Sequence, residues 1–349
     1  MINELVIHLG DTKTGSTSIQ KALAQKAYEA PGKSICYPTK NNHIALAKTL
    51  TQKPRFKNRE ARFSRVSKAF QESDADYGII SAEHFQFVDP RVLNDAIETY
   101  WPQFRDRLRL VAYVRPHAGK FLSAFSERVK LGADMASLEA LFETVSAKKQ
   151  LDFTPRFETG REVFGSDLSV RPFVRDRLHK SDVVQDFFKY LLNNDAFEIT
   201  GDTAANPSLT VSQLALLRVI HRQMESKAKG RKGPKFRNMQ GKFGRAVSEY
   251  LRANGIGNGG EKLRMPTGML ARFQERYAPD AEAMDQGFFE GFPFSDDLEN
   301  AGRDATAEDQ PLEAADHFTA VEIAEVLRYT DSLAATMMKK RFAAQQAAG

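Results

Sequence analysis

The clearest indication of the fold is the stretch V-I-H-L-G-D-T-K-T-G-S-T-S-I-Q, residues Val6–Gln20. An apolar run is followed by a loop of glycine and hydroxyl residues, and then by an amphipathic segment that begins with three hydroxyl residues. This order predicts a strand, a tight turn and a helix whose first N–H groups lack partners within the helix. The helix dipole favours an anion at such a terminus, and Gly10 and Gly15 let the backbone bend close to it.

The first 200 residues alternate short apolar runs with longer amphipathic ones, which is the pattern of βαβ units and a parallel sheet. Strands are expected at Glu4–Leu9, Ser34–Tyr37, Tyr77–Ser81, Leu108–Val114 and Leu168–Val174. Helices are expected at Ser16–Glu29, Ala61–Gln71, Arg91–Gln103, Gly119–Leu131, Asp182–Leu192, Leu209–Met224 and Thr319–Phe342. The prediction is an α/β fold with a P-loop-like parallel sheet of about five strands flanked by helices. Residues 1–210 would form this core, and residues 211–349 a helical C-terminal extension packed on the same domain.

The composition is that of a globular protein, since 42% of the 349 residues are hydrophobic and 27% are charged. The net charge of +5 is modest. A single cysteine, Cys36, excludes an intrachain disulfide and any zinc site built from several cysteines. The N-terminus does not resemble a signal peptide, and no apolar run reaches the length of a membrane span. The expected location is cytoplasmic.

Two blocks of charge interrupt the second half of the chain. Lys227–Arg245 holds eight basic residues and no acidic one, and its glycines and proline predict a loop that could close over an anion. Residues 280–316 hold twelve acidic residues against a single Arg303, and they are expected to form a solvated loop.

The loop after the first strand differs from a nucleotide-triphosphate loop in one decisive place. The spacing of G-x-x-x-x-G-K-[ST] is kept in G-D-T-K-T-G-S-T, but Ser16 stands where the lysine is needed and a lysine is found earlier, at Lys13. The run K-T-G-S-T-S-I-Q resembles bacterial carbohydrate-type members of the sulfotransferase superfamily. The resemblance implies a 3′-phosphoadenosine 5′-phosphosulfate donor. The residues that it implies for the 5′-phosphosulfate are Lys13, Thr14, Gly15, Ser16, Thr17 and Ser18.

A second motif follows the strand expected at Leu108–Val114. It reads R-P-H-A-G-K-F-L-S, with Arg115 at the strand end and Ser123 eight residues later in a helix. The same resemblance implies that Arg115 and Ser123 hold the 3′-phosphate of the donor. An arginine offers a fork of donors to phosphate oxygens at any working pH. The two motifs are expected to face each other about one nucleotide's length apart. A later R-K-G, Arg231 to Gly233, repeats a further phosphate contact of cytosolic relatives.

Sulfuryl transfer needs a base for the acceptor hydroxyl and positive charge near the leaving phosphate oxygen. Lys13 can supply the charge, and no metal is expected. The loop I-I-S-A-E-H-F offers Glu83 and His84 as bases, of which Glu83 is preferred because carbohydrate-type relatives often use glutamate. If the chain stays extended there, the two side chains point to opposite sides. His43 and His8 are rivals, although a lone histidine within a strand is more often structural.

The function predicted from the resemblance is transfer of a sulfuryl group to an acceptor hydroxyl on a carbohydrate or glycolipid, with release of adenosine 3′,5′-bisphosphate. Two alternatives stay open. A kinase or NTPase with a divergent phosphate loop would bind ATP with magnesium. A non-enzymatic binder of acidic polymers would use Lys227–Arg245 and the basic stretch Lys48–Lys68, with an affinity that falls steeply with salt. Nucleic acid is not favoured, because few aromatic residues lie among these cations. The oligomeric state is left open.

Overall fold

The computed structural model describes residues 1–133, 137–193, 196–201, 208–228 and 233–346. The strands are β1 (Glu4–His8), β2 (Ile35–Cys36), β3 (Tyr77–Ser81), β4 (Leu108–Val114) and β5 (Leu168–Pro172). The α-helices are α1 (Ser16–Gln25), α2 (Ile44–Thr51), α3 (Arg59–Gln71), α4 (Pro90–Tyr100), α5 (His117–Lys130), α6 (Leu138–Ala147), α7 (Thr154–Phe164), α8 (Val183–Leu191), α9 (Val211–Lys227), α10 (Pro234–Ala253), α11 (Thr267–Phe288), α12 (Pro293–Asn300) and α13 (Ala320–Gln346). All five expected strands are present, with bounds within two residues of those predicted.

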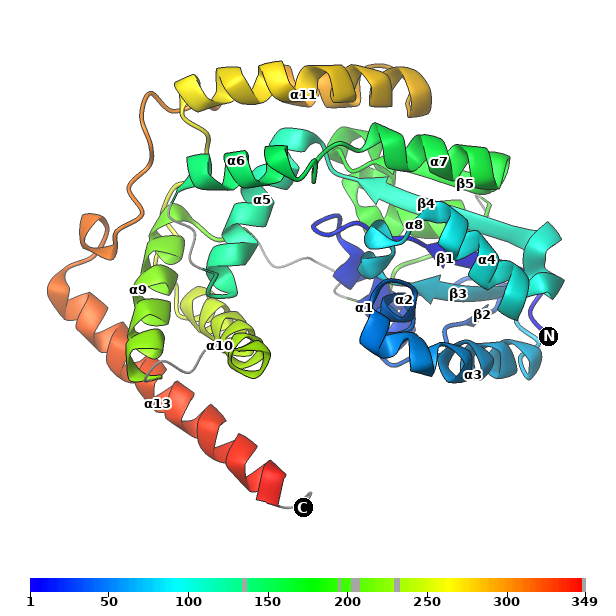
Figure 1. Ribbon diagram of the computed structural model, residues 1–349, viewed down its shortest axis with the longest axis horizontal. Helices are drawn as coiled ribbons and strands as arrows, with labels where there is room; N and C mark the ends of the chain where they lie inside the picture. The colour runs from blue at the N-terminus through cyan, green and yellow to red at the C-terminus, as the bar shows by residue number, and fades with distance from the viewer. Residues whose placement is uncertain (134–136, 194–195, 202–207, 229–232, 347–349) are drawn as a thin grey trace. The chain divides into compact units, whose positions relative to one another are not determined.

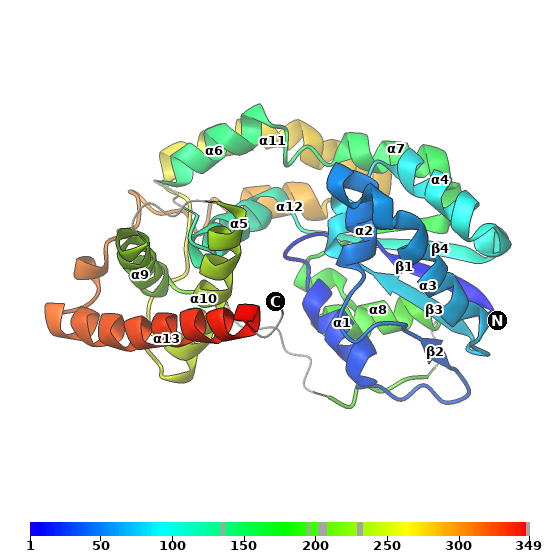
Figure 2. The same ribbon diagram turned by 60° about the horizontal axis from the view of Figure 1, so that its bottom comes forward.

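The five strands form one parallel sheet in the order β2-β3-β1-β4-β5. Helices cover both faces: α1 and α8 lie on one, and α2, α3, α4 and α7 on the other, as Figures 1 and 2 show. The predicted fold class, an α/β parallel sheet flanked by helices with a helical C-terminal region, is confirmed.

Alternation along the strands divides the core between the two faces. In β1, Leu5 and Ile7 join the cluster under α2, α3, α4 and α7, whereas Val6 joins the cluster under α1 and α8. In β4, Leu110 and Val111 divide in the same way. Because both faces are covered, the inner strands are apolar at nearly every position, which is why they could be recognised in the sequence.

The chain divides into two compact units that interleave along the sequence. The first contains residues 1–120, 150–206 and 277–298, and the second contains residues 121–149, 207–276 and 299–349. Residues 277–298, which hold the end of α11 and most of α12, fall in the first unit together with the sheet. In the second unit α9, α10 and α13 contact one another, and Tyr250 stacks on Tyr329 with ring centroids 3.8 Å apart.

The basic block is not a loop where the structure describes it, because residues 234–245 lie in α10. Pro234 occupies the first turn of the helix, where its missing N–H costs nothing. Gly244 is required there by packing, since a Cβ would lie 1.8 Å from the Lys130 carbonyl oxygen. Of the R-K-G run, Arg231 and Lys232 lie outside the described residues, and Gly233 directly precedes α10.

The prediction of a solvated acidic loop is also wrong in its first part, because residues 280–288 and 293–300 are helical. Two of the carboxylates bind the first N–H groups of other helices. Asp280 accepts from Phe153 N and Thr154 N, at the start of α7, and Asp285 accepts from the backbone at the start of α12. Helix termini carry unpaired N–H groups, so carboxylates gather there for structural reasons.

Candidate functional site

The carboxyl ends of β1 and β4 form the point at which the sheet reverses its winding (Figure 1). From β1 the chain crosses to β2 on one side, from β4 it crosses to β5 on the other, and β1 and β4 are neighbours. Open parallel sheets bind ligands in the crevice at such a point. The loop 9–15 follows β1 and Arg115 follows β4, so both predicted motifs come to this place.

The backbone of the loop after β1 is held tightly against its neighbours. Gly10 has φ 56°, and a Cβ there would lie 2.7 Å from the Cα of Glu83. Gly15 has φ 74°, and a Cβ there would lie 2.5 Å from a methyl group of Val183. Both positions therefore require glycine. Lys13 also has a positive φ, 70°, which a lysine rarely adopts, so the surrounding structure imposes the shape of the loop.

A buried carboxylate anchors this loop from behind. Asp11 is 1% exposed, and its Oδ1 accepts a 2.7 Å hydrogen bond from Lys120 Nζ. The same ammonium donates to the carbonyl oxygen and hydroxyl of Thr12, at 2.5 and 2.9 Å. Arg156 Nη2 lies 3.7 Å from the second carboxylate oxygen. Burial lowers the pKa of Lys120, and the Asp11 carboxylate opposes that shift. The arrangement fixes Thr12 and with it the direction of the loop.

Arg115 connects the two motifs. Its Nη1 lies 3.5 Å from the Lys13 carbonyl oxygen, within hydrogen-bond reach, so the loop after β1 and the end of β4 are adjacent. The guanidinium lies against Gly119, where a Cβ would be 2.9 Å from Nε. Burial lowers the pKa of Arg115, and the nearby Asp297 opposes this. Burial raises the pKa of Asp297, which Arg115 and the Gly119 N–H counteract.

The hydroxyl groups of the loop divide into two classes. Thr14 and Ser16 are buried, and both hydroxyls donate to the Asp11 carbonyl oxygen, at 2.7 and 3.2 Å, so they brace the loop. Thr17 is exposed, and Ser18 is buried in the first turn of α1. This turn has no side-chain cap and no acidic residue. Its N–H groups are consequently suited to an anion.

Ser123 lies one helical turn after Lys120 on α5, in the part of that helix that belongs to the second unit. The expectation that Ser123 lies in the helix that follows β4 is confirmed. It is half-buried.

Glu83 and His84 begin a 3₁₀ helix, η2 (Glu83–Phe87), so the chain does not stay extended after β3, and the condition for the two side chains to point to opposite sides is not met. The backbone of Glu83 packs against Gly10, so Glu83 lies beside the glycine-containing loop that follows β1. His84 is turned toward α2, where its Nε2 lies 2.9 Å from the Thr51 hydroxyl. Burial lowers the pKa of His84, and Lys48 and Arg55 add to this effect.

The other two histidines belong to a buried polar layer beneath the loop. His8 Nδ1 lies 2.8 Å from the Ser81 hydroxyl, to which the Gln20 amide also donates. His43 Nδ1 accepts from the Ser81 backbone N–H at 3.1 Å. Burial lowers the pKa of His8 to about 3 and that of His43 to about 4. Both rings are therefore neutral at pH 7, and the nitrogen that would act as a base is buried or already used.

The buried histidines predict a pH-dependent stability. In the unfolded chain, His8 and His43 have a pKa of about 6.5 and bind protons below that pH. In the folded protein the same two side chains stay neutral. The free energy of unfolding should then fall by about 1.4 kcal/mol per pH unit for each histidine, down to a pH near 4. Urea unfolding between about pH 7 and about pH 5 measures this slope. His43→Gln, which keeps an acceptor for Ser81, should make the slope shallower by the contribution of one histidine, about 1.4 kcal/mol per pH unit. An unchanged slope would show that other groups cause the effect.

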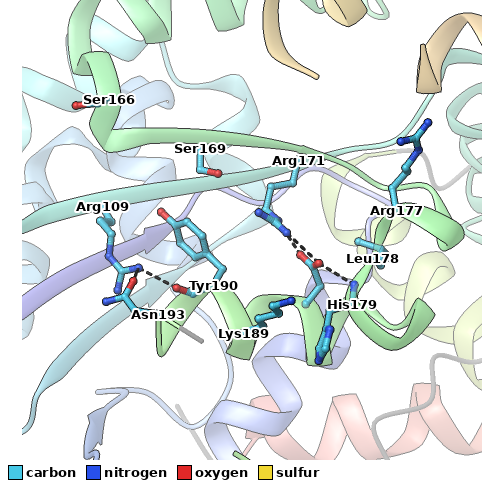
Figure 3. Close-up of a pocket in the computed structure, with 11 residues that line it drawn as sticks. Arg109, Ser166, Ser169, Arg171, Arg177, Leu178, His179, Lys189, Tyr190 and Asn193 are labelled. Atoms are coloured by element: carbon cyan, nitrogen blue, oxygen red, sulfur yellow. Dashed lines mark hydrogen bonds and ion pairs between the residues drawn. The ribbon is translucent and has the colours of Figure 1, made fainter. Parts of the chain in front are cut away.

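A pocket lies between the edge strand β5 and α8, apart from the switch-point site (Figure 3). It is about 590 Å³ and rich in cations. Arg171 pairs with the buried Asp186, Nε to Oδ1 at 2.7 Å, and Asp186 also accepts from the Tyr113 hydroxyl. Arg109 donates to the last carbonyl oxygens of α8 and pairs with Glu4. Both arginines are thus engaged within the fold.

Three polar residues of the switch-point site were missed by the sequence reasoning: Asp11, Lys120 and Arg156. Asp11 is the one of the three that the sequence could have indicated, because it lies within the glycine-containing loop, between Gly10 and Lys13. Lys120 and Arg156 meet it only through the fold, at sequence separations of more than one hundred residues.

In the ranges that the structure describes, no three His, Cys, Asp or Glu side chains gather in a way that could hold a metal ion. No helix within the same ranges combines the length and the apolar character of a membrane span. No family model, no curated protein and no solved structure matches this chain.

Proposed function

We propose that the protein is a sulfotransferase that uses 3′-phosphoadenosine 5′-phosphosulfate and transfers its sulfuryl group to a hydroxyl of a carbohydrate or glycolipid. The observation that carries the proposal is the meeting of Lys13 and Arg115 at one switch point, where Arg115 Nη1 lies 3.5 Å from the Lys13 carbonyl oxygen. This contact joins the Arg115 guanidinium to the backbone of the loop that carries Lys13, so the two motifs that would hold the two anionic groups of the donor are adjacent.

The charge of the site supports an anionic ligand. Four cationic side chains lie at or just behind the loop, namely Lys13, Arg115, Lys120 and Arg156. Asp11 pairs with Lys120 and lies 3.7 Å from Arg156, and Asp297 lies near Arg115. The Asp11 carboxylate is buried and accepts from Lys120 and from the Thr12 N–H, and burial raises the pKa of Asp297. The first-turn N–H groups of α1 add the positive end of a helix dipole.

Each residue has a role in the proposed step. The acceptor oxygen attacks sulfur in line with the bond to the leaving phosphate oxygen, and that S–O bond breaks as the new one forms. Lys13 stabilises the charge that develops on the leaving oxygen of adenosine 3′,5′-bisphosphate. Glu83, whose backbone abuts Gly10, takes the proton of the acceptor hydroxyl. Arg115 holds the 3′-phosphate. Asp11 and Lys120 keep the loop in place.

A thermal-unfolding titration tests this assignment. Adenosine 3′,5′-bisphosphate without magnesium should stabilise the full-length protein, by about 2.7 kcal/mol at one hundred times its Kd. ATP should have a smaller effect, with or without magnesium. A larger effect of ATP that needs magnesium would identify the kinase or NTPase alternative instead. Transfer of label from donor that is labelled in its sulfur to an added glycan or glycolipid then tests the reaction itself.

A further inference from the structure

A segment rich in lysine and arginine lies in the same compact unit as the candidate site. The segment from Ala30 to Arg59 contains seven lysines and arginines and no aspartate or glutamate. It forms β2, α2 and the 3₁₀ helix η1 (Lys53–Asn58), and it leads into α3. Lys53, Arg55 and Lys57 are exposed. In the part of the chain that the structure describes, no carboxylate forms an ion pair with these three side chains or with Lys48.

Two exposed phenylalanines stand among these cations. Phe56, in η1, is 42% exposed, and Phe87, at the end of η2, is 63% exposed. Single exposed apolar side chains are common, but apolar side chains that form one patch mark a surface that binds a partner or a membrane. The remaining aromatic of the basic stretch, Phe63, is fully buried in the core and plays no part in this face.

The two phenylalanines belong to one continuous surface. His84 links them: its ring lies 5.2 Å from that of Phe87, and its Nε2 contacts Thr51 at the end of α2. α2, which carries Lys48, contacts both η1, which carries Arg55, and η2, which carries His84. Phe56 follows Arg55 directly. We call the set Lys48, Lys53, Arg55, Phe56, Lys57, His84 and Phe87 the basic-aromatic face.

We propose that the basic-aromatic face docks the protein onto a lipid bilayer that carries anionic headgroups. Charge complementarity and the two exposed rings both match that partner: cations attract the headgroups, and apolar rings enter the interface between headgroups and acyl chains. A soluble acidic polysaccharide would match the cations, but it would leave Phe87 in water. One side of the Phe56 ring is also covered by the Arg59 guanidinium, 4.9 Å from the centroid, which limits stacking on a sugar.

The docking surface has a consequence for the reaction, and this consequence alone rests on the proposed function. Glu83, the proposed base, precedes His84 in η2, so the face begins at the site itself. A bilayer bound there would present headgroup hydroxyls to the loop. The acceptor class is then a glycolipid and not a soluble carbohydrate.

Sedimentation with vesicles tests the docking without any use of catalytic activity. The full-length protein should bind vesicles of phosphatidylcholine that contain phosphatidylglycerol, and it should bind pure phosphatidylcholine vesicles far more weakly. Lys53→Gln combined with Lys57→Gln should weaken partitioning by about thirtyfold, since each cation near an anionic surface contributes about fivefold. Phe56→Ser combined with Phe87→Ser should weaken it by about tenfold or more.

Matched controls separate docking from other causes. Phe292→Ser removes a phenylalanine that is 62% exposed outside this face, and it should leave partitioning unchanged. Lys148→Gln combined with Lys149→Gln removes two exposed lysines elsewhere and should do the same. Thermal unfolding checks that every variant is folded.

Equal binding to neutral vesicles, or binding to anionic vesicles that survives loss of both phenylalanines, would overturn the proposal. So would dextran sulfate that binds as tightly as the vesicles and is insensitive to both phenylalanines. Adenosine 3′,5′-bisphosphate binding that persists in docking-deficient variants would leave the proposed function standing.

Discussion

Lys13→Ala should lower the turnover of sulfuryl transfer by about 10²–10³-fold while the affinity for adenosine 3′,5′-bisphosphate falls less than about tenfold. The negative charge on the leaving oxygen grows only as the S–O bond breaks, so an ammonium group aimed there acts mainly on the transition state. Steady-state kinetics with donor and acceptor gives kcat, and calorimetric titration with the bisphosphate gives the affinity.

The backbone conformation of Lys13 provides a control for this substitution. Since Lys13 has φ 70°, Lys13→Gly removes the ammonium and also relieves the left-handed strain, whereas Lys13→Ala removes the ammonium alone. If the charge causes the loss, both variants should lose the same factor in kcat, and Lys13→Arg should retain part of the activity. A glycine variant as active as the wild type would show that only the loop shape matters. Equal losses in kcat and in bisphosphate affinity would make Lys13 a binding residue.

The parts of the fold that could be predicted are those dictated by local pattern. β3 and β4 have the bounds predicted because each is a mostly apolar run that is buried on both faces along most of its length. α10 was missed because glycine normally argues against a helix, whereas Gly244 is needed to let the chain at Lys130 approach. That requirement is set by a contact more than one hundred residues away in sequence. The interleaving of the two units has the same origin, since Asp280 caps α7 from a distant helix.

The candidate site could likewise be predicted only in part from the sequence. Lys13 and Arg115 could be named because each stands next to a strand end that the sequence identifies. The directions of the side chains could not be predicted, because they depend on tertiary contacts. Ser16 has the residue type expected for an anion ligand, but its hydroxyl donates to the Asp11 carbonyl oxygen. His84 was paired with Glu83 by sequence alone, and the turn of η2 directs it to Thr51.

Arg115→Ala should weaken binding of adenosine 3′,5′-bisphosphate by about tenfold to a hundredfold, because a hydrogen bond to a charged group contributes roughly 1.5 to 3 kcal/mol. If Arg115 holds the 3′-phosphate, the loss must depend on that phosphate. AMP, which lacks it, should bind the wild type and the variant with nearly equal affinity. Calorimetric titration of both proteins with both ligands gives the coupling between the guanidinium and the 3′-phosphate directly.

The position of Arg115 sets the controls for that comparison. Arg175 is an exposed arginine three residues beyond the end of the neighbouring strand β5, so Arg175→Ala matches the change in charge and should leave both affinities unchanged. Arg115→Lys keeps the charge but loses the fork of donors, and it should recover only part of the affinity.

Because Asp297 faces Arg115 from α12, the alanine variant also leaves a buried carboxylate without its cation, which raises the pKa of Asp297 further and lowers stability. Arg115→Ala combined with Asp297→Asn removes that carboxylate. If the double variant still discriminates between the bisphosphate and AMP as the wild type does, Arg115 does not hold the 3′-phosphate, and the two motifs do not share one donor.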